Sequence, residues 1–585
     1  MTIRETRMQK ITACIERILG DVGPVFYLSV LIIASFVGAA ALYPDRVEQY
    51  SQNLLDATAT NVGWMYLIAT SGFVLFAGFL ALSRYGNFRL GPPDEPPEFS
   101  YNSWLAMIFS GGMGVGLVFW GVAEPMMHFN QPPLGIGQPQ TPEAAQLGMR
   151  YAFFHWGLHQ WANFTLVGLA IAYVRFRHNS RGLISETFRP LLGDRVDHWP
   201  GKIIDILAVI STIFGVATTL GLGALQINSG LARLDFMAYD VTAQFSIIAA
   251  LGALFTLSAM TPLSFGIRYL SNLNMLLAAG LLLYVLTQGP TAFIFSELTQ
   301  TLGEYLGNIV EMSLVTTPYS SAHWVEQWTM FYWAWGLSWA PFVGSFIARI
   351  SRGRTIREFV TGVMLVPVGL SVLWFSAFGG SAIHFELFDG AGIAEAVQQE
   401  VPAGLYALFD LLPGGHYAAI AAIALVSMFV ITSADSATFV LGMFTSKGVL
   451  NPTRFVRILW GALQLLMAAV LLFSGGLYGL RTLSILAAFP FMLLMVLMAV
   501  SLHRDLRQEL WRREEKQQLL HERVEKLLLR ESEREAQRLK EEQAHPTAPE
   551  ECGTERADSA DCEANSDATP VGARPSETAT QQERR

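Results

Sequence analysis

The sequence predicts an all-α polytopic membrane protein with twelve transmembrane helices. Of its 585 residues 52% are hydrophobic and only 15% are charged, which is too apolar for a soluble chain. The apolar residues also come in runs of about 20, the length that a helix needs to cross a bilayer. These runs begin near Val25, Val62, Trp104, Ala152, Ile203, Phe245, Leu273, Thr329, Phe359, Ala418, Val456 and Leu480.

Charged residues between the runs orient the predicted spans. An even number of spans places both termini on one side of the membrane. Basic residues gather in the loops on the side of the N-terminus, at Arg84, Arg89, Arg268 and within 175–202, 349–357 and 447–457. The alternate loops hold little beyond Arg46, Arg233 and Arg481. Because basic loops stay in the cytoplasm, both termini are expected there.

Polar segments flank the membrane core, which is expected over residues 24–502. Residues 1–23 form a basic cytoplasmic segment without a cleavable signal. Residues 503–544 mix Glu, Arg, Lys, Gln and Leu, which predicts a charged helix that is either a solvated face or a regulatory arm. Residues 545–585 lack periodicity and predict a disordered tail. This tail is rich in acids, so the net charge of −9 says little about partners, and no nucleic-acid partner is expected.

An amphipathic helix is predicted between the seventh and eighth runs. Leu298, Leu302, Tyr305 and Ile309 recur at helical spacing beside acids such as Glu304. This segment is too polar to span the membrane. It either lies along the outer surface or packs on the bundle as an ordinary loop helix.

The eighth run carries a stripe of aromatic residues. At 100° per residue, Trp335, Trp339, Phe342 and Phe346 fall on one helical face. Aromatic faces attract cations, so a stripe that faces a cavity can hold a quaternary ammonium with on the order of 2 kcal/mol per desolvated contact. The alternative is an interfacial belt or simple packing.

The third run is interrupted by glycines. Gly111, Gly112, Gly114 and Gly116 lie within six residues, followed by Glu124. Each glycine costs a helix about 1 kcal/mol relative to alanine. The cluster therefore indicates either an unwound turn, whose carbonyls and amides can bind ions and anions, or close helix packing.

The fourth run adds rings and histidines. Trp161 and Phe164 share a face, and Trp156 stands about 140° around the helix from Trp161. His155 and His159 are one turn apart, a spacing that also occurs in metal sites. No third ligand is apparent nearby, so a metal is not expected.

The tenth run contains hydroxyls and an acid. Thr432, Ser433 and Asp435 interrupt an apolar segment, and intramembrane carboxylates normally face the protein interior. The hydroxyls could join main-chain carbonyls in a Na⁺ site or bond back to their own helix. The third, fourth and eighth runs lack an interior Asp or Glu. This absence favours a zwitterion, whose carboxylate can meet amide hydrogens, over a simple cation.

These motifs together resemble the betaine/carnitine/choline transporter family. The resemblance rests on GMGVG in the third run, HWGLHxW in the fourth, FYWAW and WAPFVGSFIARISRGRT in the eighth, and TSADSAT in the tenth, and covers residues 23–502. It implies twelve helices with LeuT-like inverted five-helix repeats, the third to seventh and the eighth to twelfth spans. It also implies a homotrimer among membrane lipids, multi-pass in a bacterial inner membrane.

The resemblance also implies roles for single residues. The substrate site would comprise Trp156, Trp161, Phe164, Trp333, Trp335, Trp339, Gly112, Met113 and Gly114, and Phe342 and Phe346 would act as gates. The Na⁺ site would use Ser110, Met113, Phe429, Thr432 and Ser433. The family's W-A-W-W-x-x-W pattern has Gly336 in place of its second adjacent tryptophan here, which is expected to remove one wall and admit a wider substrate. The glutamates of the charged C-terminal helix would contact Arg349, Arg352 and Arg354.

The predicted function is secondary active symport, by alternating access, of a quaternary-ammonium or related onium solute such as glycine betaine, choline or carnitine, coupled to Na⁺. Proton-coupled choline uptake and a dimethylsulfoniopropionate or ectoine carrier are alternatives, and a non-transporting membrane sensor is more remote. An enzyme is not expected, since no P-loop, nucleophile elbow or metal triad is apparent. The three cysteines, Cys14, Cys552 and Cys562, suggest no disulfide framework or metal cluster. No cofactor is expected beyond the coupling ion, which is Na⁺ or alternatively H⁺.

Overall fold

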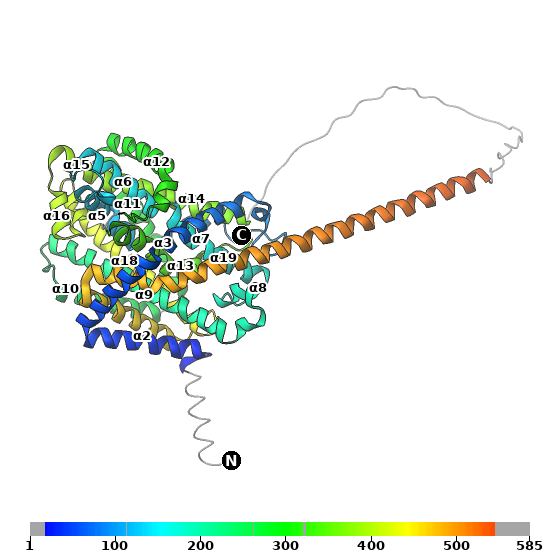
Figure 1. The fold of residues 1–585 in the computed structure, drawn as a ribbon, viewed down its shortest axis with the longest axis horizontal. Helices are drawn as coiled ribbons and strands as arrows, with labels where there is room; N and C mark the ends of the chain where they lie inside the picture. The colour runs from blue at the N-terminus through cyan, green and yellow to red at the C-terminus, as the bar shows by residue number, and fades with distance from the viewer. Residues whose placement is uncertain (1–17, 113, 261–262, 320–322, 545–585) are drawn as a thin grey trace, which may run out of the picture. The chain divides into compact units, whose positions relative to one another are not determined.

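The computed structural model describes residues 18–112, 114–260, 263–319 and 323–544, and within them every extended element is a helix (Figure 1). This confirms the predicted fold class at the level of an all-helical protein with long apolar helices. The chain divides into two compact units, one ending at Trp511 and one beginning at Arg512.

The first half of the chain contributes the helices up to the sharp bend that follows Gln288. Their bounds are α2 (Pro24–Leu42), α3 (Pro44–Leu82), α4 (Tyr101–Gly112), α5 (Val115–Asn130), α6 (Pro142–Trp156), α7 (Leu158–Arg177), α8 (Arg189–Leu192), α9 (Trp199–Arg233), α10 (Val241–Met260) and α11 (Leu263–Gln288).

The second half begins with α12 (Thr291–Leu314). It continues with α13 (Phe331–Ile350), α14 (Ile356–Phe375), α15 (Ser381–Asp389), α16 (Ile393–Gln399), α17 (Ala403–Asp410), α18 (Gly415–Thr445) and α19 (Arg454–Ala544). A π-helical turn, Glu326–Met330, leads into α13. Within α19 the backbone leaves the helical region at Gly476, between the predicted eleventh and twelfth spans.

By length and composition, six of the described helices can cross a membrane. A seventh crossing results if Asn272–Gln288 and Thr291–Leu314 are one bent span. The predicted number was twelve, and part of the difference has a structural source. The third and fourth runs are each split into two shorter helices, α4 with α5 and α6 with α7. The number twelve therefore stays a prediction.

The predicted amphipathic helix is confirmed as α12. It leaves α11 at an angle of 108° and buries Tyr305, whose hydroxyl accepts a hydrogen bond from the backbone N–H of Leu158 at 3.1 Å. Of its acidic residues, Glu304 accepts a hydrogen bond from Gln146 at the surface, and Glu297 accepts one from Thr301. This helix is thus packed on the bundle.

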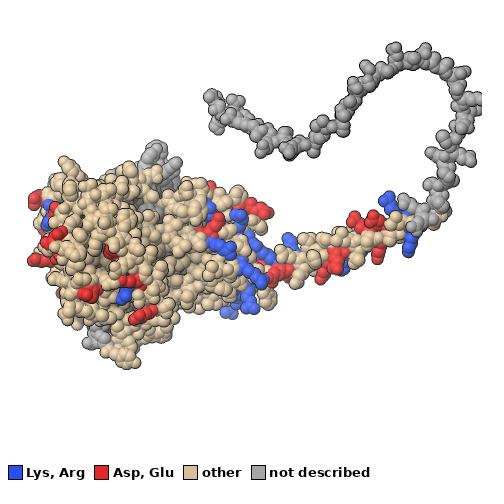
Figure 2. Space-filling model, turned by 90° about the horizontal axis from the view of Figure 1, so that it is seen from above, with Lys and Arg blue, Asp and Glu red and all other residues tan. Residues whose placement is uncertain are grey.

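Charged side chains are distributed unevenly over the surface. Lys and Arg gather at one end of the bundle beside several acids, mainly Asp and Glu mark the opposite end, and few charges lie between (Figure 2). At the basic end, Arg349 pairs with Glu98 and Arg352 pairs with Glu95, both at 2.9 Å. Arg354 lies over Trp104, 4.9 Å from the ring centroid. Within the first unit these arginines are thus engaged by the loop after α3 and by α4. Their expected contact with the glutamates of the C-terminal helix stays a prediction.

The start of the charged segment of α19 contacts the end of α7. Glu509 accepts hydrogen bonds from Tyr173 and Arg177, and Asp505 is 2.9 Å from His178 Nε2. These contacts tie the last turns of the first unit to the segment just after the predicted fourth span.

Candidate functional site

The helix is interrupted within the glycine-rich run, as expected if these glycines form an unwound turn. Helix α4 ends at Gly112 and α5 begins at Val115, with Gly114 as its N-cap. Met113 lies outside the described residues, and of Ser110 and Gly112 only the helical backbone is described. A Cβ atom placed on Gly114 would lie 3.9 Å from Ser433 Oγ and 3.9 Å from a ring carbon of Trp339. The break therefore meets α13 and α18 at one point.

An aromatic row runs beside this break. Trp156 of α6 and Trp335 of α13 meet edge to face with centroids 6.1 Å apart, and the row continues to Trp339 at 6.3 Å and Phe342 at 5.6 Å. The exposed fractions of Trp156, Trp335 and Trp339 are 9%, 6% and 7%. The rings thus lie inside the protein, which excludes the interpretation as a lipid-facing belt.

Gly116 of α5 makes room for two rings of this row. A Cβ atom there would overlap Trp335 and come within 2.8 Å of Trp156. The edge of Trp335 is also held from the other side, because its indole N–H donates to the carbonyl of Gly215 on α9 at 3.3 Å. Glycine is therefore needed at 116 for its small volume.

The other predicted aromatic site residues make their ring contacts with residues outside this row. Trp161 and Phe164 contact each other on α7, with centroids 5.4 Å apart. Trp333 stacks on His159 at 4.9 Å and contacts Phe154. Phe346 is half-buried at the edge of the core. Whether these residues bind substrate or act as gates stays a prediction.

The predicted gap at Gly336 is filled. A Cβ atom on Gly336 would overlap the side-chain carboxamide of Gln160 from α7. The missing tryptophan therefore does not simply widen the site, because a polar group from the neighbouring helix stands in its place. The sequence interpretation missed Gln160, which lies next to Trp161 and one turn before Phe164.

A buried carboxylate supports the first ring of the row. Glu124 of α5 accepts a hydrogen bond from Trp156 Nε1 at 2.8 Å and lies 2.6 Å from His155 Nδ1. The other ring nitrogen of His155 is 3.0 Å from the hydroxyl of Thr329. The expectation of a site without an interior acid is thus wrong, since Glu124 reaches Trp156 from the outer part of the third run.

Glu124 also corrects the prediction about the histidines. The candidate metal-ligand atoms of Glu124, His128 and His155 lie within 4.8 Å of one another. The additional ligands for His155 that the sequence did not reveal thus come from α5. The short contact to Glu124 already satisfies His155 Nδ1 as a hydrogen bond. His159 faces elsewhere, with Nε2 2.9 Å from the Ser313 hydroxyl. The one-turn spacing of His155 and His159 therefore defines no joint site.

Arg481 is a further residue whose role the sequence analysis missed. Its guanidinium lies over Trp120 and Trp328 at 4.7 Å and over Phe331 at 4.9 Å, a cation–π arrangement. It lines a cavity of about 210 Å³ together with polar residues such as Glu326. From the sequence, Arg481 was expected only to be a basic residue in a loop.

The predicted ion-binding hydroxyls differ in their bonding. Thr432 donates back to the carbonyl of Met428 at 2.9 Å and contacts that of Phe429 at 3.2 Å, and it accepts from Asn274 at 3.3 Å. This is the local bonding that the alternative interpretation described. Ser433 instead lies beside the break at Gly114.

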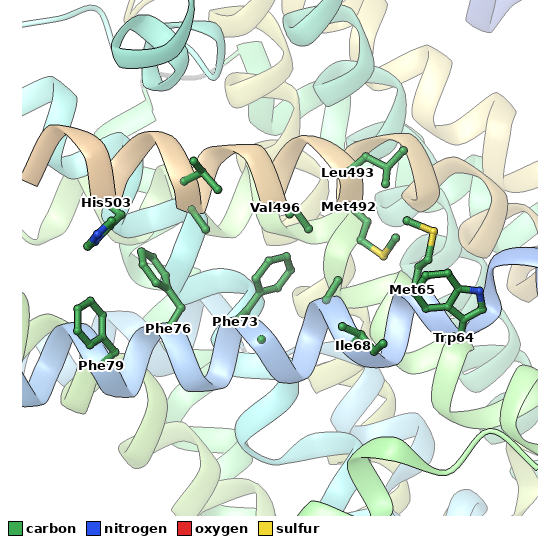
Figure 3. Close-up of a pocket in the computed structure, with 14 residues that line it drawn as sticks. Trp64, Met65, Ile68, Phe73, Phe76, Phe79, Met492, Leu493, Val496 and His503 are labelled. Carbon is green, nitrogen blue, oxygen red and sulfur yellow. The ribbon is translucent and has the colours of Figure 1, made fainter.

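A larger cavity of about 680 Å³ runs along α3 and α19 and shares no residue with this site. Figure 3 shows its lining, which is apolar from Trp64 through Phe73 and Phe76 to Met492 and ends at His503. Such a groove offers no charge pair for a small polar solute.

The fold and this site together define a helical membrane protein with enclosed aromatic rings beside a broken helix, an arrangement suited to a small polar solute. The chain belongs to the betaine/carnitine/choline family of transporters, whose family model matches residues 24–510. Its members are transporters and not enzymes.

Three relatives illustrate the range of the family. The chain is 46% identical to the glycine betaine transporter OpuD of Bacillus subtilis over 495 residues, 84% of this chain and 96% of that protein. It is 43% identical to an ectoine/hydroxyectoine transporter of Virgibacillus pantothenticus over 483 residues, 83% and 96% of the two chains. It is 38% identical to the osmo-dependent choline transporter BetT2 of Acinetobacter baylyi over 493 residues, 83% and 72% of the two chains.

Proposed function

We propose that this protein is a symporter that imports a small onium solute into a bacterial cell, driven by Na⁺ and working by alternating access. In this proposal twelve spans with two inverted five-helix repeats form each subunit of a homotrimer, and both termini are cytoplasmic. The substrates named for its relatives, glycine betaine and ectoine, support this solute class.

One observation carries the proposal: a side chain at Gly114 would contact both Ser433 and Trp339. An ion held by the Ser433 hydroxyl and by carbonyls of the broken helix would fix the backbone at 114. The backbone at Gly114 also lies next to the ring of Trp339 in the aromatic row. Ion binding would thus organise the solute site, and binding of either one would favour binding of the other.

The proposal includes an orientation for the solute, which the geometry supports. Its cationic head would lie against Trp156 and Trp335, where each ring contact contributes about 2 kcal/mol when desolvated. Its carboxylate would meet the free amides at the N-terminus of α5 and the indole N–H of Trp339. That N–H is buried and has no hydrogen-bond partner among the described residues.

Proton coupling is a second candidate, favoured by Glu124 and its histidines. A proton on this cluster would alter the hydrogen bonds that hold Trp156. The buried carboxylate would also serve a cationic solute such as choline as a counter-charge.

Uptake into proteoliposomes decides between these drives. Radiolabelled glycine betaine, ectoine and choline are offered under an inward Na⁺ gradient without a pH gradient. The measurement is then repeated under an inward proton gradient without a Na⁺ gradient. Accumulation with Na⁺ alone is the expected result. Accumulation only with a proton gradient would replace Na⁺ coupling by proton coupling, and no accumulation under either would leave a sensor.

A further inference from the structure

A polar group interrupts the aromatic lining at Gly336. The carboxamide of Gln160 fills the space where a side chain at 336 would stand. Its Oε1 atom is buried and has no hydrogen-bond partner among the described residues, although the side chain as a whole is only half-buried. Buried polar atoms are normally paired, so an unpaired one calls for a partner that is absent from the protein itself.

The contact between Gln160 and Gly336 has a fixed register. Eight residues further along each helix, Gly168 of α7 meets Gly344 of α13, where a Cβ atom on Gly344 would lie 2.9 Å from the Gly168 nitrogen. The two helices therefore run in parallel at close range and hold the carboxamide in place. Close approach through glycines is a common way for membrane helices to pack.

The contact between Gln160 and Gly336 lies on helical turns that also carry predicted solute-binding residues. On α13 it faces Gly336, directly after Trp335 and one turn before Trp339. On its own helix it precedes Phe164 by one turn. We therefore place the unpaired Oε1 atom of Gln160 within reach of a cationic head bound between α7 and α13.

This oxygen distinguishes between cationic heads. A fully methylated ammonium carries no N–H and would leave Oε1 unpaired in a desolvated site. A head with an N–H would donate to it, and hydrogen bonds to charged groups are among the stronger ones. Sites built to accept a substrate N–H discriminate against analogues that lack it far better than apolar walls discriminate by size.

We propose that Gln160 makes this site selective for zwitterions whose cationic head carries at least one N–H, such as a cyclic amidinium, over fully methylated ammonium solutes. The inference rests on the proposed function and names its substrate class. Gln160 is the specificity-determining acceptor, and Gly336 is the residue that makes room for it.

The sharpest probes are N,N-dimethylglycine and glycine betaine, because they differ only in one N–H replaced by N–CH₃. Binding of each is titrated by tryptophan fluorescence on the full-length protein in nanodiscs, and uptake of each is followed in proteoliposomes. The wild type should bind dimethylglycine more tightly. In Gln160→Leu this preference should fall about tenfold or more, as expected for the loss of a hydrogen bond to a charged group.

Gly336→Ala tests the same contact from the opposite helix. Its methyl group would displace the end of the Gln160 side chain, so the preference should fall in the same direction even if Gln160→Leu folds poorly. Gly303→Ala on α12 is the matched control, because no atom lies within 4 Å of its added methyl. The control should keep the wild-type preference.

The outcomes separate this inference from the proposed function. If both solutes are transported and neither variant changes their ratio, the role of Gln160 is wrong and the proposed transport function stands. If the wild type neither binds nor accumulates these two solutes or ectoine, the proposed function fails and the inference fails with it.

Discussion

The indole N–H of Trp156 donates to Glu124 at 2.8 Å, and His155, the residue before Trp156, lies 2.6 Å from the other oxygen of the same carboxylate. One buried acid therefore fixes two consecutive side chains at the end of α6. Since Trp156 begins the aromatic row, Glu124 is a positioning residue for the candidate solute site.

Glu124→Gln should weaken solute binding without unfolding the protein. The amide keeps the shape but can accept from only one of the two partners, and a lost hydrogen bond to a charged group is worth about 1.5–3 kcal/mol. The apparent affinity should therefore fall by a factor of about ten or more, with a smaller effect on the maximal rate. Uptake kinetics measure this, with Glu143→Gln, at the exposed start of α6, as the control. Equal affinities in both variants would remove Glu124 from the site.

Gly116→Ala should disturb two rings at once. The added methyl would overlap Trp335 and approach Trp156 to 2.8 Å, and both rings are held in place by hydrogen bonds. We expect a loss of about 1–3 kcal/mol from overpacking and a clear loss of solute affinity. Thermal unfolding and binding titrations check the two effects, with Gly280→Ala as a control whose methyl meets no atom within 4 Å. Wild-type affinity in Gly116→Ala would show that the solute binds elsewhere.

The aromatic row and the helix break were predictable because both follow from local spacing. Trp335 and Trp339 share a face by the helical period alone, and the glycine cluster weakens any helix. The supporting partners were not predictable in the same way. Glu124 reaches Trp156 across 32 positions of the chain, and Gln160 reaches Gly336 from another helix. Such contacts depend on the packing register of two helices, which a single sequence does not encode locally.

The tenth run shows the same limit. Its hydroxyls were visible in the sequence, but not which of them faces the break. Thr432 turned out to bond to its own helix and to Asn274, whereas Ser433 lies beside Gly114. The difference arises because consecutive residues of a helix point about 100° apart.

Ser433→Ala should therefore affect Na⁺ dependence more than Thr432→Ala. Removing the hydroxyl beside the break takes away one oxygen ligand of the proposed ion site, so the Na⁺ concentration for half-maximal uptake should rise severalfold. Thr432→Ala should have a smaller effect, because that hydroxyl already donates to Met428. Uptake at varied Na⁺ and fixed solute measures both. The reverse order would place the ion on the Thr432 side, and no change in either variant would favour proton coupling.

The contact between His178 and Asp505 predicts a pH dependence at the start of the charged segment of α19. The hydrogen bond to Asp505 raises the pKa of His178 above its ordinary value, against partial desolvation. A raised pKa means that the folded contact binds the proton more tightly. Its stabilising effect is therefore fully present below about pH 6.5, the ordinary value for histidine, and is lost as the pH rises through the raised pKa.

Hydrogen-exchange protection of residues 503–511 should fall between pH 6 and pH 9, after correction for intrinsic exchange rates. His178→Gln should flatten this dependence, while Arg177→Gln, which removes the contact to Glu509, should lower protection equally at both pH values. A pH dependence that persists in His178→Gln would assign it to another group.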